Sequence, residues 1–280
     1  MAPVRALFAT DLDGTLVDRQ DGIHPRDRAA IAWARENGVA VTIATGRLTS
    51  RTHPVARDLG LDAPLVCADG GVIACATTER VLSERAISID LVEGILTAFV
   101  EHSLSSFVFT HRAIHCCERG REHHGYVSGW ARDITTHADV LAADVWRTGP
   151  EATVMVLGIG SEEMVRRVEA VLGPTGAEVD ALGFGVGDRR VVRFVSRGTS
   201  KGSGLEVVAR QLGLGRDRVA AIGDWYNDVP MFGWAQRSFA MPHAPADVKA
   251  TATDVLGEGS AERGAIAEAL EAWMGELDRR

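Results

Sequence analysis

The chain lacks the features that would mark a secreted or membrane-bound protein. Its first residues do not have the layout of a signal peptide, and no apolar run is long enough to span a bilayer. Four cysteines, at positions 67, 75, 116 and 117, show no spacing typical of a disulfide framework. These absences predict a soluble protein of the cytoplasm whose thiols are reduced.

Positive charge is also scarce, since 30 Lys and Arg residues face 38 Asp and Glu residues and leave a net charge of −8. This balance argues against a general nucleic-acid binder or a protein of anionic membranes. A small phosphorylated molecule remains compatible as a ligand, because a few cations at one site decide whether it binds.

Two glycine-rich stretches lack the spacing of the nucleotide-binding motifs that they suggest. Gly183-x-Gly185-x-Gly187-Asp188 lies between two strand-like runs, and it predicts a hairpin rather than a dinucleotide-binding loop. Gly198-Thr-Ser-Lys201-Gly does not have the spacing of a P-loop, which argues against an ATPase.

Both ends of the chain alternate between apolar strand patterns and helix patterns, without internal repeats or low-complexity linkers. Continuous apolar strands separated by helices predict a parallel sheet that is covered on both faces. The predicted strands are 4–10, 39–45, 64–68 and 218–222, and the predicted helices are 25–37, about 46–59, 202–212 and 261–277.

The middle of the chain departs from this alternation. Its helices and hairpin-like strands predict an α+β unit. The helices are 89–102 and 161–172, and the strands lie near 107–110, 114–117, 153–159, 178–185 and 190–195. We therefore predict the α/β class: a Rossmann-like parallel core of residues 1–80 and 194–280, interrupted by an inserted domain of residues 81–193.

Polar residues gather at the predicted strand ends of the core. In open α/β sheets, ligands bind beyond the carboxyl ends of the strands, so these clusters predict one shared site. The clusters are Asp11-Leu12-Asp13, Thr45-Gly46-Arg47, Lys201-Gly202 and Gly223-Asp224-Trp225-Tyr226-Asn227-Asp228.

The first cluster favours a metal and a phosphate as ligands. Asp11 and Asp13 are two positions apart on an extended segment, so both side chains are expected on the same side. Burying two carboxylates is costly unless a cation lies between them. Gly14 allows the backbone to approach a ligand closely. The alternative interpretation is that an Asp-Gly pair only marks a turn.

Taken in order, the motifs resemble those of the haloacid dehalogenase-like phosphatase superfamily, and within it the Cof-type group with a subtype B cap. The resemblance covers the whole chain, with the insertion where that group carries its cap. The matching stretches are 11–16, 44–47, the lone Lys201 before a helix, 223–228 followed by Met231, and 240–241 with 248–249.

This resemblance implies a chemistry for the carboxylates. Asp11 would be the nucleophile that forms an aspartyl-phosphate, and Asp13 the general acid and then the general base. Mg²⁺ would be held by Asp11, the backbone carbonyl of Asp13, and Asp224. Enzymes must supply up to about 28 kcal/mol for phosphate-monoester hydrolysis. One donor supplies only about 3–4 kcal/mol, so several groups must act together.

The remaining site residues are assigned in the same way. Thr45, Gly46 and Arg47 would bind the substrate, although Thr45 alternatively caps the next helix and Arg47 is alternatively a surface residue. Lys201 would neutralise the phosphoryl group and the nucleophile, unless it is simply solvated.

Two further residues follow the Asp224 motif. Asn227 would contact phosphate or a metal-bound water. Asp228 is expected to support the metal site or Lys201 rather than to bind metal. Trp225 and Tyr226, which lie between Asp224 and Asn227, would either line the wall of the pocket or pack in the core.

Two positions depart from the family pattern. Asp69 precedes Gly70 where asparagine is usual, and His243 precedes Ala244 where asparagine is also usual. A carboxylate at position 69 would repel a phosphate unless it faces the metal site or a hydroxyl or amine of the substrate.

Histidines and cysteines of the inserted region raise a zinc hypothesis. Adjacent cysteines on a strand face opposite ways and the spacing fits no standard site, so a role in specificity is favoured. The residues are His111, His115, Cys116, Cys117, His123 and His124.

The sequence thus predicts a Mg²⁺-dependent phosphatase of a small phosphorylated metabolite, with sugar phosphates as the class that the resemblance favours. Nucleic acid and membranes are not expected partners, and the protein is expected to be a monomer or homodimer. A phosphomutase, a non-catalytic sensor of a phosphorylated ligand and a protein-partner module are the alternatives.

Overall fold

The computed structural model describes residues 4–18, 20, 22–149, 151–172, 178–186 and 189–277. The chain divides into two compact units. The core unit comprises Met1–Gly46, Thr52–Leu82 and Ser200–Arg280, and the insert unit comprises Arg47–Arg51 and Ser83–Thr199. Residues 194–199 and 47–51 therefore group with the insert unit, whereas the sequence placed them in the core.

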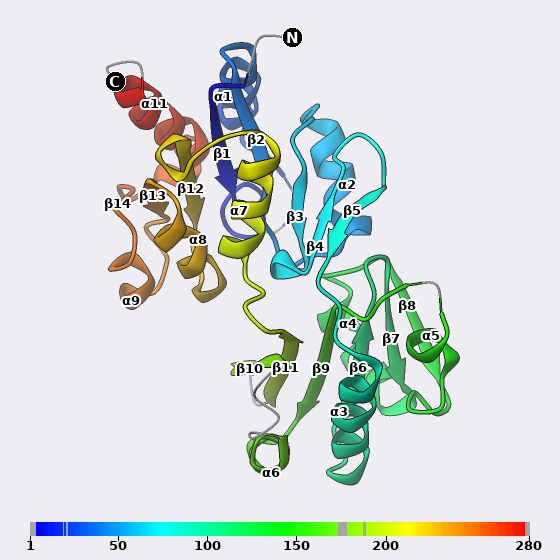
Figure 1. Cartoon of the computed structure of the whole chain (residues 1–280). Coiled ribbons are helices and arrows are strands. Elements are labelled where there is room, and N and C mark those ends of the chain that lie inside the picture. The colour runs from blue at the N-terminus through cyan, green and yellow to red at the C-terminus, as the bar shows by residue number, and fades with distance from the viewer. Residues whose placement is uncertain are drawn as a thin grey trace. The chain divides into compact units, whose positions relative to one another are not determined.

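A five-stranded parallel sheet in the order β14-β13-β12-β1-β2 forms the centre of the core unit (Figure 1). This topology confirms the predicted α/β class. The strands are β1 (Ala6–Thr10), β2 (Val39–Ile43), β12 (Val219–Gly223), β13 (Arg237–Ala240) and β14 (Asp254–Val255).

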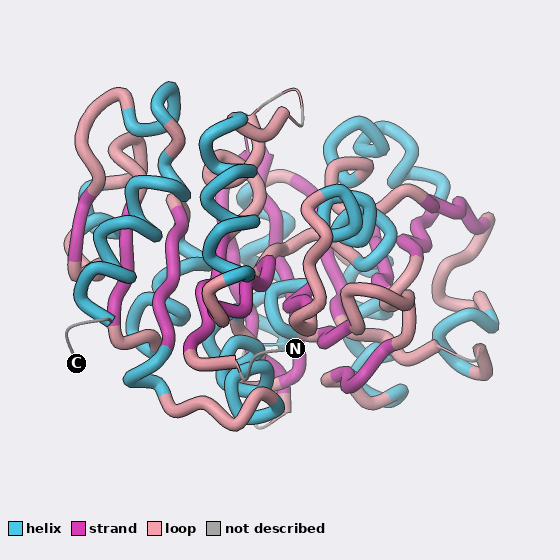
Figure 2. Tube along the Cα trace, turned by 90° about the horizontal axis from the view of Figure 1, so that it is seen from above, coloured by secondary structure: helices cyan, strands magenta, loops and turns pink. Residues whose placement is uncertain are grey.

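Helices cover both faces of this sheet, which is why β1 is buried along its whole length. On one face Phe8 packs against Trp273 of a C-terminal helix, with 6.0 Å between the ring centroids. On the other face Leu7 and Ala9 belong to a cluster with Leu205 and Val208. Figure 2 shows the strands in magenta with helices in cyan packed beside them. The helices of this unit are α1 (Pro25–Glu36), α2 (Thr49–Asp58, whose first residues group with the insert unit), α7 (Lys201–Gln211), α8 (Val229–Trp234), α9 (Ala246–Lys249), α10 (Ser260–Arg263) and α11 (Ala265–Leu277).

The predicted third parallel strand is not part of the main sheet. β3 (Leu65–Cys67) belongs to a small separate sheet with β4 (Val72–Ala74) and β5 (Val81–Glu84). A single bridge between Ala44 and Val66 joins β3 to the end of β2. The reason is the tight turn that follows, where Ala68, Asp69 and Gly70 all have positive φ and the chain reverses into antiparallel β4.

The predicted C-terminal helix is interrupted at Gly264, where φ is +95°. α10 ends before this glycine and α11 begins after it. Asp27 on α1 then caps α11 from the side, because its Oδ1 accepts a hydrogen bond of 2.8 Å from the backbone N–H of Ala267. Burial raises the pKa of the Asp27 carboxyl, so the ionised form is disfavoured in the folded protein.

We expect Asp27→Ala to lower the free energy of unfolding by about 1–2 kcal/mol, because the helix loses its cap. Asp27→Asn should cost less, since the amide oxygen still accepts. The proton on Asp27 stabilises the fold at low pH, and this contribution is lost as the pH rises through the raised folded pKa. In urea unfolding, the free energy of unfolding of Asp27→Asn should therefore rise relative to that of the wild type as the pH rises. A constant difference between the two would contradict this.

The insert unit contains a six-stranded sheet in the order β10-β11-β9-β6-β7-β8, antiparallel except for the pair β7 and β8. Its strands are β6 (Ser105–Phe109), β7 (Ala113–Cys117), β8 (Asp133–His137), β9 (Met155–Gly160), β10 (Val179–Val186) and β11 (Arg189–Ser196), and its helices are α3 (Ile89–Glu101), α4 (His124–Val127), α5 (Asp144–Arg147) and α6 (Glu162–Leu172).

The helices α3 and α6 pack on one face of the insert sheet. Phe99 of α3 contacts β9 so closely that a Cβ on Gly158 would lie 2.8 Å from its ring. On the other face, Phe109 packs against Trp130, with 5.6 Å between the ring centroids. The predicted hairpin is present as the pair β10 and β11, although residues 187 and 188 of its turn lie outside the described residues.

Segment 47–51 groups with the insert unit because it hydrogen-bonds there. The backbone N–H of Leu48 donates to the carbonyl of Trp130, and the Thr49 hydroxyl donates to the carbonyl of His111, both at 2.7 Å. Among the described helices, none combines the length and the apolar character needed to cross a membrane.

Candidate active site

Side chains from three elements converge at one end of the core sheet. Asp11 follows β1 and Asp224 follows β12, and these two strands are neighbours. Lys201 is the first residue of α7. The rule that parallel strands bring their carboxyl ends to one edge therefore places residues about 200 positions apart in one cluster.

Lys201 holds two carboxylates together in the interior. Its side chain is 1% exposed, and its Nζ donates to Asp11 Oδ1 at 2.5 Å and to Asp228 Oδ1 at 2.6 Å. Burial alone would lower the pKa of the ammonium group, but attraction to Asp11 and Asp228 outweighs burial and raises the pKa. Lys201 is therefore a fixed positive charge, which excludes the alternative that it is a solvated lysine.

Two features of the first turn of α7 fix the position of Lys201. Ser200 caps the helix by accepting from the backbone N–H of Ser203, and the Ser203 hydroxyl receives the N–H of Ser200 in return. Gly202 lies against α8, where a Cβ would be 2.3 Å from the carbonyl oxygen of Pro230. Any larger residue would push α7 away and move Lys201.

Asp11, Asp224 and Asp228 each bring one carboxylate oxygen within 4.8 Å of the others. Asp228 is already engaged, because its Oδ1 accepts from Lys201 and its Oδ2 accepts from the backbone N–H groups of Asp224 and Trp225. This leaves Asp11 and Asp224 as the carboxylates that could bind a metal, and Asp228 as their support.

The electrostatics of the cluster call for a further cation. Burial raises the pKa of Asp11 against the opposing effect of Lys201, and Asp228 and Asp224 raise it further. Burial and Asp228 likewise raise the pKa of Asp224. A divalent ion would remove this excess of negative charge, and hard oxygen donors suit Mg²⁺, so the residues fit such an ion.

Asp13 differs from Asp11 in its environment. Asp11 is buried, whereas Asp13 is exposed. The chain turns at Gly14, directly after Asp13, where φ is +82°. Gly14 lies against Asp224, because a Cβ on this glycine would be 2.9 Å from Asp224 Oδ2. Thr15, which the motif contains but our assignment of roles omitted, donates its hydroxyl to Asp224 Oδ1 at 3.1 Å.

The loop after β2 runs beside this cluster. The backbone N–H of Thr45 donates to Val66, and the carbonyl of Thr45 accepts from the N–H of Asp69, both at 2.9 Å. Thr45 does not cap the next helix, since α2 begins at Thr49. Gly46 packs on Asp69, because a Cβ on Gly46 would lie 3.3 Å from Asp69 Oδ1. Arg47 is buried and groups with the insert unit.

The two departures from the family pattern both contact residues of the cluster. Asn227 Nδ2 donates to Asp69 Oδ1 at 2.9 Å. His243 Nε2 lies 3.3 Å from Asp224 Oδ2. The sequence identified these positions as unusual, but it contained no local signal for either contact. Trp225 and Tyr226 are about half exposed, which argues against a role in the core.

The histidines and cysteines of the insert unit do not converge. Cys116 Sγ lies 3.3 Å from His124 Nε2, while His115 Nδ1 lies 3.1 Å from His137 Nε2. His115 and Cys116 are neighbours on β7 and so face opposite sides of the sheet. Within the described part of the chain, only the carboxylate cluster brings three metal-ligating side chains together.

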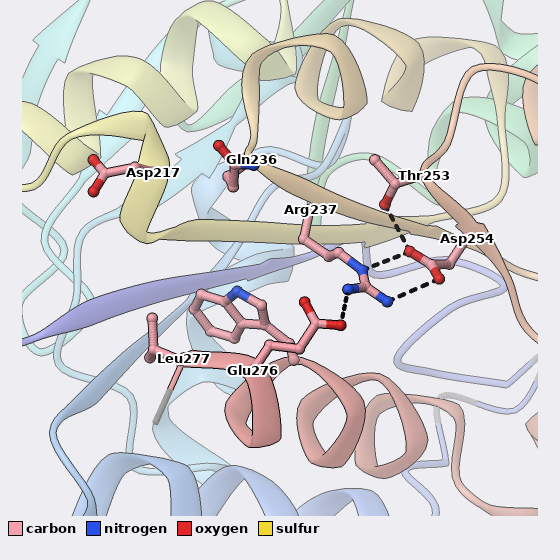
Figure 3. Close-up of a pocket in the computed structure, with 8 residues that line it drawn as sticks. Asp217, Gln236, Arg237, Thr253, Asp254, Glu276 and Leu277 are labelled. Atoms are coloured by element: carbon pink, nitrogen blue, oxygen red, sulfur yellow. Dashed lines mark hydrogen bonds and ion pairs between the residues drawn. The ribbon is translucent and has the colours of Figure 1, made fainter. Parts of the chain in front are cut away.

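A cavity of about 410 Å³ lies at the opposite end of the core strands (Figure 3). Arg237, the first residue of β13, projects into it and pairs with Asp254 and Glu276. Both ion pairs neutralise the guanidinium group. This arrangement ties β13, β14 and α11 together, and it does not offer a free cation to an anionic ligand.

Comparisons with known proteins show which proteins this chain is similar to. The HMP-PP phosphatase of Klebsiella pneumoniae is 25% identical over 278 residues, which cover 97% of each chain. Pyridoxal phosphate phosphatase YbhA of Escherichia coli is 26% identical over 259 residues, covering 91% of this chain and 94% of the relative. A haloacid dehalogenase-like hydrolase from Bacteroides thetaiotaomicron has the same fold, with a TM-score of 0.79 at 24% identity and coverage of 95% of this chain and 98% of that one.

A family model described as haloacid dehalogenase-like hydrolase matches residues 8–270, which include the carboxylates, Lys201 and the whole insert unit. The chain therefore belongs to the haloacid dehalogenase-like hydrolases.

Proposed function

We propose that the protein hydrolyses phosphate monoesters of small metabolites through a covalent intermediate on Asp11. The observation that carries this proposal is the buried Lys201, which contacts Asp11 and Asp228 at 2.5 and 2.6 Å. The charge of Lys201 opposes the effect of burial on the pKa of Asp11. Its hydrogen bond also directs one oxygen of that carboxyl group, as a nucleophile requires.

In the first half of the reaction, Asp11 Oδ1 stays on Lys201 and Oδ2 attacks phosphorus. The bond between phosphorus and the ester oxygen breaks as the bond to Oδ2 forms. Asp13, which is exposed beside the buried nucleophile, gives its proton to the leaving alkoxide. Lys201, the Thr45 hydroxyl and the backbone N–H of Gly46 stabilise the charge on the transferred phosphoryl group.

In the second half, Asp13 takes a proton from water, and the water attacks the phosphorus of the aspartyl-phosphate. The bond between phosphorus and Asp11 breaks, and inorganic phosphate and the free carboxylate are released. Mg²⁺ would be held by Asp11, Asp224 and the backbone carbonyl of Asp13. When bound, it supplies positive charge that shields the phosphoryl oxygens from the carboxylates.

The substrate class is drawn from the relatives. HMP-PP and pyridoxal phosphate are named for two of them, and a structural relative is named as a sugar phosphatase. We propose that this chain acts on a metabolite of similar size, with sugar phosphates as the first class to test. The insert unit, Arg47 included, would select the leaving group. We propose that the enzyme works in the cytoplasm as a monomer or homodimer.

The test is the release of inorganic phosphate from a panel that contains p-nitrophenyl phosphate, sugar phosphates, nucleotides and phosphorylated cofactors. We expect turnover with Mg²⁺, at least a tenfold loss in EDTA, and recovery when Mg²⁺ is added in excess, because charge shielding by the metal is worth several kcal/mol. Phosphate transfer within a sugar without release would favour the phosphomutase, and tight binding without turnover would favour the sensor. Full activity in EDTA would contradict the metal assignment.

A further inference from the structure

A side-chain bridge joins two loops of the candidate site. Asn227 lies in the loop that follows β12 and supplies Asp224 and Asp228. Asp69 lies beside the loop of Thr45 and Gly46. The hydrogen bond from Asn227 Nδ2 to Asp69 Oδ1 therefore connects the metal-binding side of the site to its phosphate-binding side, across 158 residues of sequence.

The chemistry of the partner determines which way the amide of Asn227 points. The hydrogen bond has Nδ2 of Asn227 as its donor and Oδ1 of Asp69 as its acceptor, and a carboxylate oxygen suits a donor rather than the amide oxygen. The planar amide then turns its Oδ1 away from Asp69. None of the described residues donates to this oxygen, and Asn227 is part-exposed. Oδ1 is thus an acceptor that is held in a fixed direction.

Asp69 itself is held rigidly. Its side chain is buried, its backbone has φ of 52° and ψ of 32°, and its N–H donates to the carbonyl of Thr45. The next residue, Gly70, packs on the residue before Lys201, because a Cβ there would lie 2.1 Å from the carbonyl oxygen of Ser200. Asp and Asn both tolerate this left-handed conformation, so exchanging one for the other leaves the backbone unstrained.

We propose that Asp69 is a positioning residue that turns Oδ1 of Asn227 toward the leaving group of the substrate. The site then selects phosphate esters whose leaving group carries an O–H or N–H donor close to the ester oxygen. This inference rests on the proposed phosphatase function. With asparagine at position 69, the partner could donate as well as accept, and the amide of residue 227 could bind in either orientation.

The experiment compares Asp69→Asn with the wild type on two esters. One is a polyol phosphate such as glycerol 1-phosphate, and the other is propyl phosphate, which has the same chain length but no hydroxyl. We expect Asp69→Asn to lower kcat/KM for the polyol ester about tenfold, chiefly through KM, which is the effect of one hydrogen bond. The value for propyl phosphate should change less than twofold.

A double variant tests whether Asp69 acts through Asn227. Asn227→Ala should lose the same preference for the hydroxylated ester, and Asp69→Asn should add nothing further in the Asn227→Ala background. Additive losses would overturn the proposal. An equal loss of kcat/KM on both esters, together with a lower melting temperature, would show that Asp69 only stabilises the fold, and this would also overturn the proposal. A wild type that hydrolyses both esters equally well would also overturn the proposal, and one that releases phosphate from no ester of the panel contradicts the proposed function itself.

Discussion

Asp11→Asn is expected to reduce turnover by a factor on the order of 10⁴ or more, which is typical of losing a nucleophile. The variant keeps the shape of the side chain and an oxygen that accepts from Lys201 Nζ. A neutral amide, however, is a poor nucleophile, and it cannot form the aspartyl-phosphate. The loss should fall on kcat, because the proposed substrate-binding residues Lys201 and Thr45 and the proposed metal ligand Asp224 remain in place.

Two measurements decide this prediction. Wild-type enzyme quenched in acid during turnover of a ³²P-labelled ester should carry label, and the Asp11→Asn variant should carry none. Asp18→Asn is a matched control, since Asp18 is exposed and accepts from the N–H groups of residues 20 and 22, as an asparagine also would. Turnover of Asp11→Asn within tenfold of this control would contradict the assignment of the nucleophile.

Lys201→Met is expected to damage both activity and stability. Methionine fills a similar volume, but it leaves Asp11 and Asp228 buried without their cation. Breaking a buried ion pair by removing one partner costs about 3–5 kcal/mol. Turnover should fall by a factor on the order of 10³, since the variant loses the charge that we propose to stabilise the transferred phosphoryl group.

The pH dependence separates this effect from a simple loss of packing. Lys201 has a raised pKa, so its contribution to stability is present below the ordinary lysine pKa and is lost only as the pH rises through the higher folded value. In the variant, Asp11 loses the cation that opposes the effect of burial on its pKa, so its carboxyl group binds a proton more readily than in the unfolded chain. The loss of unfolding free energy in Lys201→Met, relative to the wild type, should therefore be large near neutral pH and smaller in mild acid.

The chain offers a matched control, because Lys201 and Lys249 are its two lysines. Lys249 is part-exposed, and its Nζ donates to the carbonyl of Pro242 at 3.0 Å. Lys249→Met should cost no more than about 1 kcal/mol, as expected for one partly solvated hydrogen bond. Urea unfolding of the three proteins without added metal provides the comparison. A similar deficit in the two variants, or one that does not change with pH, would refute the role of Lys201.

Much of the core could be predicted because its signals are local. Apolar runs such as Ala6–Thr10 and Val219–Gly223 mark strands that are buried on both faces, and helix patterns between them mark a parallel sheet. The same local reasoning brought Asp11, Lys201 and Asp224 to one edge, since parallel strands end together there.

Other features could not be predicted, because they depend on contacts between distant residues. The turn at 68–70 removes β3 from the main sheet, and its positive φ angles have no sequence signal beyond Asp69-Gly70. The exposure of Asp13 beside a buried Asp11 follows from the turn at Gly14, not from the alternation of an extended strand. The grouping of segment 47–51 with the insert unit depends on its hydrogen bonds to Trp130 and His111.

The amino-acid sequence by itself determined the strands and helices of the core and the chemical types of the residues at the strand ends, because periodicity and side-chain chemistry are local properties. Only the tertiary structure decided which of these groups touch. Lys201 meets Asp11 across 190 residues, and Asn227 meets Asp69 across 158. Contacts of this kind depend on the packing of whole elements, such as α7 against Gly70 and α8, and the local pattern of the sequence does not contain them.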